Sequence, residues 1–307
     1  MRSARRVAAA SLVCLVAAAC DGTPAVDRSA LADEAVTVAS FNFPESVLLA
    51  EIYAQAMESE GYRVERELAL GTREFVIPAL AGGLVEFVPE YTGSGLDFLA
   101  GAGAASADRD FTYGSLVEYL EPLGVVALDA ARAEDQNGFA VTAETAERFG
   151  LVTLSDLAAV SEPLAFGGPP ECQDRPRCLP GLRARYGITF DEIVELDSGG
   201  PLTLAALLQG TVDVALLFTT DGAIDRHDLV LLRDDRELQP VEAVTPVIRT
   251  ETMTRLGPGL ARIVNAVSAA LTTGELRRLN AEVSVDDPPS AIAAGWLAEN
   301  GLVEGLG

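Results

Sequence analysis

The stretch EFVPEYTGSG occupies residues 86–95 and joins a strand-like segment to a glycine-rich turn, with Glu90 and Tyr91 at the junction. A strand delivers side chains to one edge of a sheet, and glycines let the backbone approach a ligand. The amides at the start of the next helix then face the same space. We therefore expect Tyr91 and Thr92 to line a binding site. An ordinary strand-to-helix turn in which Tyr91 covers the core would give the same pattern.

Strand and helix patterns alternate before this stretch. Residues 36–39 and 62–68 have the composition of strands, and a helix is expected from Pro44 to the breaker Gly61. A second helix is expected over residues 74–80. This β-α-β-α-β order predicts a mostly parallel sheet with helices on its faces, and so an α/β fold.

The N-terminus has the composition of an export signal. Three arginines precede an apolar stretch over residues 7–19, which is shorter than the roughly 20 residues of a membrane span. Small residues directly before Cys20 resemble the lipobox of bacterial lipoproteins. We predict a signal peptide over residues 1–19, a lipid anchor at Cys20 and a tether over residues 20–35, with plain secretion as the alternative. The protein is then extracytoplasmic and anchored to the outer face of the cell membrane.

The roughly 290 residues left after cleavage favour two lobes over one. A second series of strands and helices begins near Phe139, and the C-terminal part holds one strand followed by helices only. That part is expected to return to the first lobe. We predict lobe 1 over residues 36–130 and 241–307 and lobe 2 over residues 131–240. Two crossover segments would join the lobes around a ligand cleft.

Cysteine content and charge narrow the possible partners. Only Cys172 and Cys178 remain beyond the predicted signal peptide and anchor, and an even pair in an oxidising compartment suggests a disulfide. No metal and no cofactor are expected, because the only histidine is His227. The mature charge of (22 − 3) − 46 = −27 argues against nucleic acid and against adhesion to anionic lipid.

Catalysis is poorly supported by the sequence. His227 lies between Arg226 and Asp228 in a polar loop and has no nucleophile motif to serve. Glu86 and Glu90 could form the carboxylate pair of a hydrolase, but the aromatic-rich subsite of a glycosidase is missing. We expect a protein that is not an enzyme, with the carboxylate hydrolase as an alternative.

Four loops, each directly after a predicted strand, are candidates for ligand binding. They occupy residues 40–45, 71–73, 86–95 and 218–222. In parallel sheets, ligands bind beyond the carboxyl ends of the strands, so these loops are expected to converge on one cleft. The candidate ligand-binding residues that they supply are Phe41, Asn42, Thr72, Arg73, Tyr91, Thr92, Phe218 and Thr220.

Several segments together resemble the substrate-binding proteins of osmoprotectant ABC importers, in particular an actinobacterial-type lipoprotein subgroup. The segments are residues 36–46, 71–72, 89–93, 166–172, 178–181, 199–203 and 218–221. The resemblance implies a two-lobed, periplasmic-binding-protein-like fold of type II whose lobes close around the ligand. It also implies capture of glycine betaine, choline or carnitine and delivery to a permease driven by a separate ATPase. We expect a monomer.

The resemblance also implies an aromatic cage for a quaternary ammonium group, which each π face attracts by about 0.5 to 2 kcal/mol. Tyr91 matches one cage position and Phe218 matches a second without a hydroxyl. The other two positions fall at Asn137 and Leu204, which are not aromatic.

Phe41, Phe43 or Phe139 would have to compensate for this incomplete cage, and Arg73 could clamp a carboxylate. A related non-cationic solute remains open as the ligand. A cell-surface receptor or scaffold lipoprotein without a transport role is a further alternative.

Overall fold

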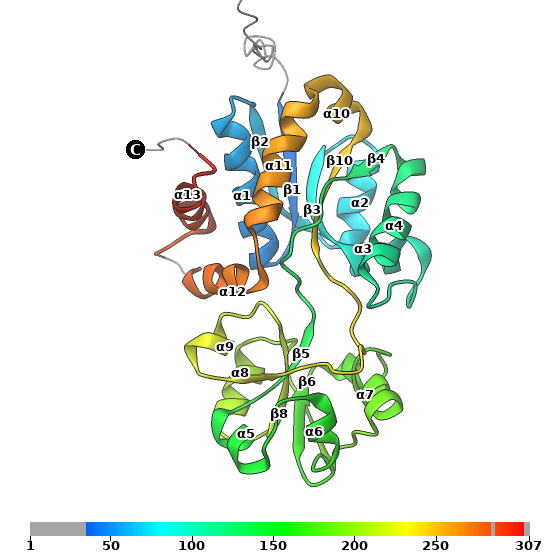
Figure 1. The fold of residues 1–307 in the computed structure, drawn as a ribbon, viewed down its shortest axis with the longest axis vertical. Helices are drawn as coiled ribbons and strands as arrows, with labels where there is room; N and C mark the ends of the chain where they lie inside the picture. Colours follow the sequence, from blue (N-terminus) through cyan, green and yellow to red (C-terminus); the bar gives the residue numbers. More distant parts are fainter. Residues whose placement is uncertain (1–34, 284–285, 304–307) are drawn as a thin grey trace, which may run out of the picture.

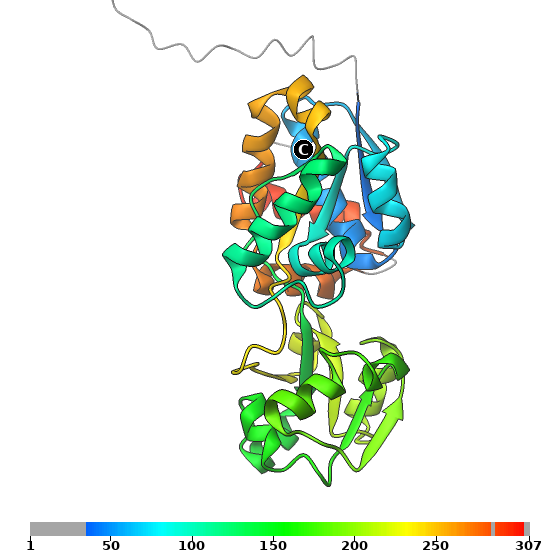
Figure 2. The same ribbon diagram turned by 90° about the vertical axis from the view of Figure 1, so that its right-hand side faces the viewer.

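Two sheets lie in two separate α/β lobes joined by a pair of extended segments (Figures 1 and 2). The structure is a computed structural model that describes residues 35–283 and 286–303. The predicted signal peptide, the Cys20 anchor and all but the end of the tether lie outside the described residues. The two-lobed α/β architecture predicted from the sequence is confirmed.

The first sheet has the strand order β2-β1-β3-β10-β4. Its strands are β1 (Val36–Phe41), β2 (Val64–Gly71), β3 (Phe87–Tyr91), β4 (Val125–Ala127) and β10 (Val244–Arg249). Strand β1 pairs in parallel with β2 and β3, as the alternation predicts, but β10 is antiparallel to both β3 and β4. Four of the five strands therefore run in the same direction, as the prediction of a mostly parallel sheet requires. Strand β10 arrives from the other lobe and runs in the opposite direction.

Eight helices within the described residues pack around this sheet. They are α1 (Pro44–Ser59), α2 (Arg73–Ala81), α3 (Thr92–Ala100), α4 (Arg109–Leu120), α10 (Thr250–Leu256), α11 (Pro258–Ala270), α12 (Thr273–Glu282) and α13 (Pro289–Glu299). Helix α1 has Pro44 in its first turn and buries Leu48, Leu49 and Ile52. The C-terminal helices return to this lobe, as expected (Figure 1).

Helices α12 and α13 are joined through the single tryptophan of the chain. Trp296 is buried, and its Nε1 donates a hydrogen bond to Glu275 Oε2 over 2.9 Å. Helix α13 also packs along α1. The orientation of α12 is thereby tied to the core of the first lobe.

The second sheet has the order β7-β6-β8-β5-β9. Its strands are β5 (Asn137–Val141), β6 (Ala165–Gly168), β7 (Glu192–Glu195), β8 (Val214–Phe218) and β9 (Val230–Leu232). Its helices are α5 (Ala143–Phe149), α6 (Leu154–Ala158), α7 (Leu179–Tyr186), α8 (Pro201–Leu208) and α9 (Ala223–Arg226). Short 3-10 turns lie at Glu121–Leu123 in the first lobe and Pro170–Gln173 in the second. This sheet is also mixed, since β5 is antiparallel to β8 and β9.

The two connecting segments run side by side between the sheets (Figure 1). Ala131 N–H donates to Val244 O over 2.8 Å, and Asp135 N–H donates to Glu242 O over 3.0 Å. Ala131 and Ala133 pack in the core of the first lobe. The exact lobe boundaries, at 130/131 and 240/241, stay a prediction.

The predicted disulfide between Cys172 and Cys178 is present in the second lobe. The loop that it closes carries Arg177, whose Nη2 reaches the first lobe. There it contacts Ala105 O at 2.8 Å and Asp97 Oδ2 at 3.2 Å. The disulfide loop therefore supplies one of the contacts between the lobes. Across the described part of the chain, the helices are all too short or too polar to be membrane spans.

Candidate functional site

The carboxyl ends of β1, β2 and β3 meet at one edge of the first sheet, facing the second lobe. Phe41, the last residue of β1, lies opposite Gly71, the last residue of β2, in the parallel register. Tyr91 ends β3 and lies opposite Val244, where β10 enters from the connecting segment. The three candidate loops of the first lobe thus share one edge, as parallel strands require.

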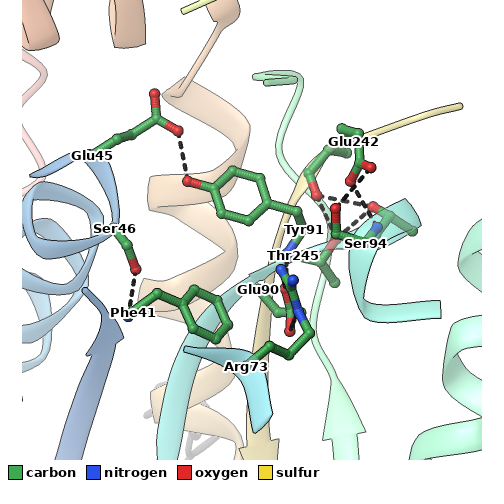
Figure 3. A network of polar contacts seen from close by, with 11 residues as sticks. Phe41, Glu45, Ser46, Arg73, Glu90, Tyr91, Ser94, Glu242 and Thr245 are labelled. Carbon is green, nitrogen blue, oxygen red and sulfur yellow. Dashed lines mark hydrogen bonds and ion pairs between the residues drawn. The ribbon is translucent and has the colours of Figure 1, made fainter. Parts of the chain in front are cut away.

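Tyr91 is the centre of a cluster formed by aromatic and acidic side chains (Figure 3). Its hydroxyl donates to Glu45 Oε1 over 2.6 Å, and only 5% of Tyr91 and 7% of Glu45 are exposed. The Tyr91 ring lies 6.0 Å from that of Phe43, which in turn lies 6.0 Å from the ring of Phe41. Phe43 is 37% exposed, so this row of rings reaches the surface of the lobe.

The turn after β8 brings the second lobe to the same cluster. Thr220 is buried, and its Oγ1 donates to Asp135 Oδ1 over 2.7 Å. Asn280, on α12, donates from Nδ2 to Glu45 Oε2 over 2.6 Å and to Thr220 O over 3.0 Å. The predicted site residues Tyr91 and Thr220 are therefore connected through Glu45 and Asn280.

The electrostatics of this cluster are dominated by carboxyl groups. Burial raises the pKa of Glu45, although hydrogen bonds from Thr220, Tyr91 and Asn280 oppose the shift. Burial and the neighbouring Glu45 raise the pKa of Asp135 well above its usual range. Burial also raises the pKa of Glu242 to about 7. Three carboxyl groups thus share a space in which a positive charge would be stabilised.

Arg73, proposed from the sequence as a clamp for a carboxylate, is engaged inside the protein. Its Nε and Nη2 donate to the two carboxylate oxygens of Glu90 over 2.9 and 2.7 Å. Its guanidinium group also lies over the Phe41 ring, 4.8 Å from the centroid. The positive charge of Arg73 is therefore paired with a buried glutamate.

The start of α3 faces the connecting segment, and the expectation that its amides face a ligand is wrong. Ser94 donates its N–H and its Oγ–H to the two oxygens of Glu242, each over 2.9 Å. Thr92 N–H donates to Ala243 O over 3.0 Å, and its hydroxyl contacts the same carbonyl. A Cβ on Gly93 would lie 2.5 Å from Val241 O. The glycine is needed because the returning chain crosses directly over it.

The second-lobe cage positions lie at the edge of the sheet that faces the first lobe. Asn137 and Phe218 are directly opposite each other in the register of β5 and β8. The Phe218 ring covers Gly199, where a Cβ would come within 3.0 Å of it. Leu204 lies on α8 and packs against an apolar cluster of the second lobe.

Three further candidate ligand-binding residues have their contacts outside the cluster around Tyr91. Asn42 and Thr72 are exposed, and Thr72 stands at the start of α2. Phe139 is buried against Phe166, with ring centroids 6.3 Å apart, in the core of the second lobe. The suggestion that Phe139 completes the cage is therefore wrong, because its ring is already packed inside the lobe.

Sequence reasoning missed four polar residues of the cluster: Glu45, Asp135, Glu242 and Asn280. Glu45 is the last residue of the candidate loop over residues 40–45, and its position as the first carboxylate after β1 was a signal that could have identified it. The other three lie in the connecting segments and in α12, and their own sequence surroundings carry no signal. In the part of the chain that the structure describes, His, Cys, Asp and Glu side chains form no group suited to holding a metal ion.

Comparison with known proteins identifies the family of the chain. The family described as the substrate-binding domain of ABC-type glycine betaine transport systems matches residues 34–299. A glycine-betaine-binding protein of Pseudomonas aeruginosa is 29% identical over 283 residues, 88% of this chain and 89% of that protein. The glycine betaine-binding protein YehZ of Escherichia coli is 30% identical over 268 residues, 84% of this chain and 88% of that protein.

Two solved structures of substrate-binding proteins have the same fold as this chain. The apo structure of YehZ superposes with a TM-score of 0.75 at 29% identity, covering 88% of this chain and 100% of that one. The crystal structure of a glycine betaine/carnitine/choline ABC transporter superposes with a TM-score of 0.80 at 26% identity, covering 87% and 99%. The chain belongs to the family of substrate-binding domains of ABC-type glycine betaine transport systems, whose members bind a solute and are not enzymes.

Proposed function

We propose that this substrate-binding protein captures a small osmoprotectant with a quaternary ammonium group, either the cation choline or a zwitterion such as glycine betaine or carnitine. The observation that carries the proposal is the grouping of Glu45, Asp135 and Glu242 around the row of rings that ends in Tyr91. A quaternary ammonium group has no N–H to donate, so it is recognised by π faces and by nearby negative charge. Relatives named for glycine betaine and carnitine support the same solute class.

The charge balance of the cluster supports a solute that carries a quaternary ammonium group over an anion. Arg73 is paired with Glu90, and its charge also acts to lower the pKa of Glu242, whereas the contacts described above give Glu45 and Asp135 no cationic partner. Burial raises the pKa of both groups and so favours their protonated forms, and a bound quaternary ammonium group would favour the ionised forms instead. In the proposed site, Phe41, Tyr91, Asn137, Leu204, Phe218 and Thr220 contact or flank the solute, and Arg73 acts on it through Glu90 and Tyr91.

The proposed cellular setting follows from the family and from the N-terminal sequence. The protein would be held on the outer face of the membrane by lipid on Cys20 and would act as a monomer. It would release its solute to a permease served by a separate ATPase subunit. Detergent partitioning of the full chain against Cys20→Ala tests the anchor, and light scattering of the mature domain tests the monomer.

Calorimetry of the mature domain tests the solute class. The panel contains choline, glycine betaine, carnitine and 3,3-dimethyl-1-butanol, the uncharged carbon analogue of choline. We expect at least one quaternary ammonium compound to bind with a Kd below millimolar and the uncharged analogue to bind far more weakly. Equal binding of choline and its uncharged analogue would overturn the assignment of a quaternary ammonium group. Binding of uncharged solutes alone would leave the family intact and refute this solute class.

A further inference from the structure

Asn280 is the one side chain of α12 whose donors reach both Glu45 of the first lobe and the backbone of the second lobe in the structure described. A single nitrogen, Nδ2, makes the 2.6 Å bond to Glu45 Oε2 and the 3.0 Å bond to Thr220 O. Glu45 is 235 residues away in the sequence. Glu45 uses its other oxygen to accept the Tyr91 hydroxyl, so one carboxylate connects Asn280 to the ring of the site.

The surrounding contacts hold the turn after β8 against α12. Arg277 donates from Nε and Nη2 to Thr219 O over 3.0 and 2.8 Å. A Cβ on Gly222 would lie 2.4 Å from Ala281 Cα, so the turn approaches the helix backbone closely. Arg226 Nη2 donates to Ala281 O over 2.6 Å from the second lobe. The second lobe therefore docks on α12 at the position where Asn280 meets Glu45.

We propose that Asn280 is a positioning residue that couples the closure of the lobes to the placement of Tyr91. The proposal rests on the proposed function, because it assumes that the solute binds beside Tyr91. When the lobes are together, the Asn280 amide satisfies Thr220 O and Glu45 at once. When they separate, the bond to Thr220 O is lost. Glu45, which accepts the Tyr91 hydroxyl, then has no link through Asn280 to the second lobe.

The two hydrogen bonds made by Asn280 Nδ2 require an uncharged group that can donate two hydrogens. Both of its partners are acceptors, and one is a carboxylate. Asn280→Asp replaces the donor by an acceptor and places a second negative charge beside Glu45. Loss of a hydrogen bond to a charged group costs about 1.5 to 3 kcal/mol, so we expect the affinity for the best solute of the panel to fall roughly 10- to 100-fold.

A reversed pair distinguishes positioning from general structural damage. In Glu45→Gln/Asn280→Asp, the new amide at position 45 donates to the new carboxylate at position 280, and the amide oxygen still accepts from Tyr91. We expect this double variant to recover part of the affinity that Asn280→Asp alone loses. Asn265→Asp is the matched control. It makes the same change of charge on α11, and its retained oxygen still accepts from Asp129 N–H.

Two measurements decide the proposal. The first is small-angle X-ray scattering without added solute, in which Asn280→Asp should enlarge the radius of gyration while Asn265→Asp remains close to wild type. The double variant should stay enlarged, because Asp at position 280 cannot donate to Thr220 O. The second is solute affinity by calorimetry. An unchanged radius for Asn280→Asp overturns the proposal, and so does an affinity that the reversed pair fails to recover. If no compound of the panel binds wild type, the proposed solute class fails, and the scattering result still decides whether Asn280 bridges the lobes.

Discussion

Arg73 and Glu90 form a two-bond ion pair at the edge where the first lobe faces the second (Figure 3). Glu90 is 1% exposed, and its Oε1 also accepts the N–H of Tyr91 over 2.7 Å. The pair thereby fixes the backbone at the residue whose ring we place against the solute. A sequence motif that looks like a ligand clamp is, in the folded protein, a support for the adjacent tyrosine.

Removing Arg73 should therefore act on stability first. Arg73→Met leaves the buried Glu90 carboxylate unpaired, and breaking a buried ion pair in this way costs about 3 to 5 kcal/mol. The free energy of unfolding in urea measures this cost. Arg73→Met/Glu90→Gln should be closer to wild type, and Arg63→Met, which removes an exposed pair with Glu65, should change little. A normal unfolding free energy with a selective loss of carboxylate-bearing solutes would instead make Arg73 a ligand clamp.

Two substitutions separate the contribution of the Tyr91 ring from that of its hydroxyl. Tyr91→Ala removes the ring and should weaken the best solute by about 1 to 3 kcal/mol. Tyr91→Phe keeps the ring and removes the donor to Glu45, so it should lower the free energy of unfolding by about 1 kcal/mol and retain most of the affinity.

Calorimetry and urea unfolding together separate these two effects. Tyr53→Phe is the control, because the Tyr53 hydroxyl shares a hydrogen bond with Ser268 inside the first lobe and should affect stability alone. If Tyr91→Ala binds every solute as wild type does, Tyr91 does not belong to the site.

Glu242 should make the protein less stable as the pH rises toward neutrality. Its pKa is about 7 in the folded state, against an ordinary value of 4.5, so the folded protein holds a proton that the unfolded chain has released. Stability is therefore highest below pH 4.5 for this group and falls as the pH rises to about 7. The difference corresponds to at most about 3 kcal/mol.

Burial raises the pKa of Glu45 and Asp135 as well, so these groups add a contribution of the same sign. Urea unfolding at a series of pH values measures the slope. Glu242→Gln should flatten it, and the exposed Glu121→Gln should leave it unchanged. A slope that Glu242→Gln leaves intact would assign the pH dependence to other groups.

Gly93 should tolerate no side chain, since Val241 O occupies the position of its Cβ. Gly93→Ala must displace either α3 or the connecting segment, and we expect a loss of about 1 to 3 kcal/mol in the free energy of unfolding. Gly114 is the matched position: it lies within α4, and a Cβ there meets nothing within 4 Å. Gly114→Ala should stabilise by about 0.5 to 1 kcal/mol. Equal effects of the two substitutions would contradict the close approach at Gly93.

The alternating elements were predictable because each has a local cause. Pro44 starts α1, the alternation from residue 36 to 91 sets three parallel strands, and the paired cysteines lie close enough in sequence to bond. The direction of β10 was not predictable, because it depends on where the chain returns after roughly 100 residues of another lobe.

The proposed site was predictable from the sequence only where its residues follow strands. Tyr91 and Thr220 do so, and the structure links them through Glu45 and Asn280. Gly93 carried an ambiguous signal, since a glycine that admits a ligand and one that admits another stretch of chain look alike in the sequence. Asn280 carried none, because its role arises from contacts made across the lobes.

Trp296 gives the protein an internal optical reporter. It is the only indole in the chain, and its hydrogen bond to Glu275 attaches it to the helix that carries Arg277 and Asn280. Any shift of that helix alters the polarity and the carboxylate field around the indole, both of which set its emission. The fluorescence of the unlabelled protein therefore follows the α12 side of the cleft from inside the first lobe, without a dye or an added cysteine.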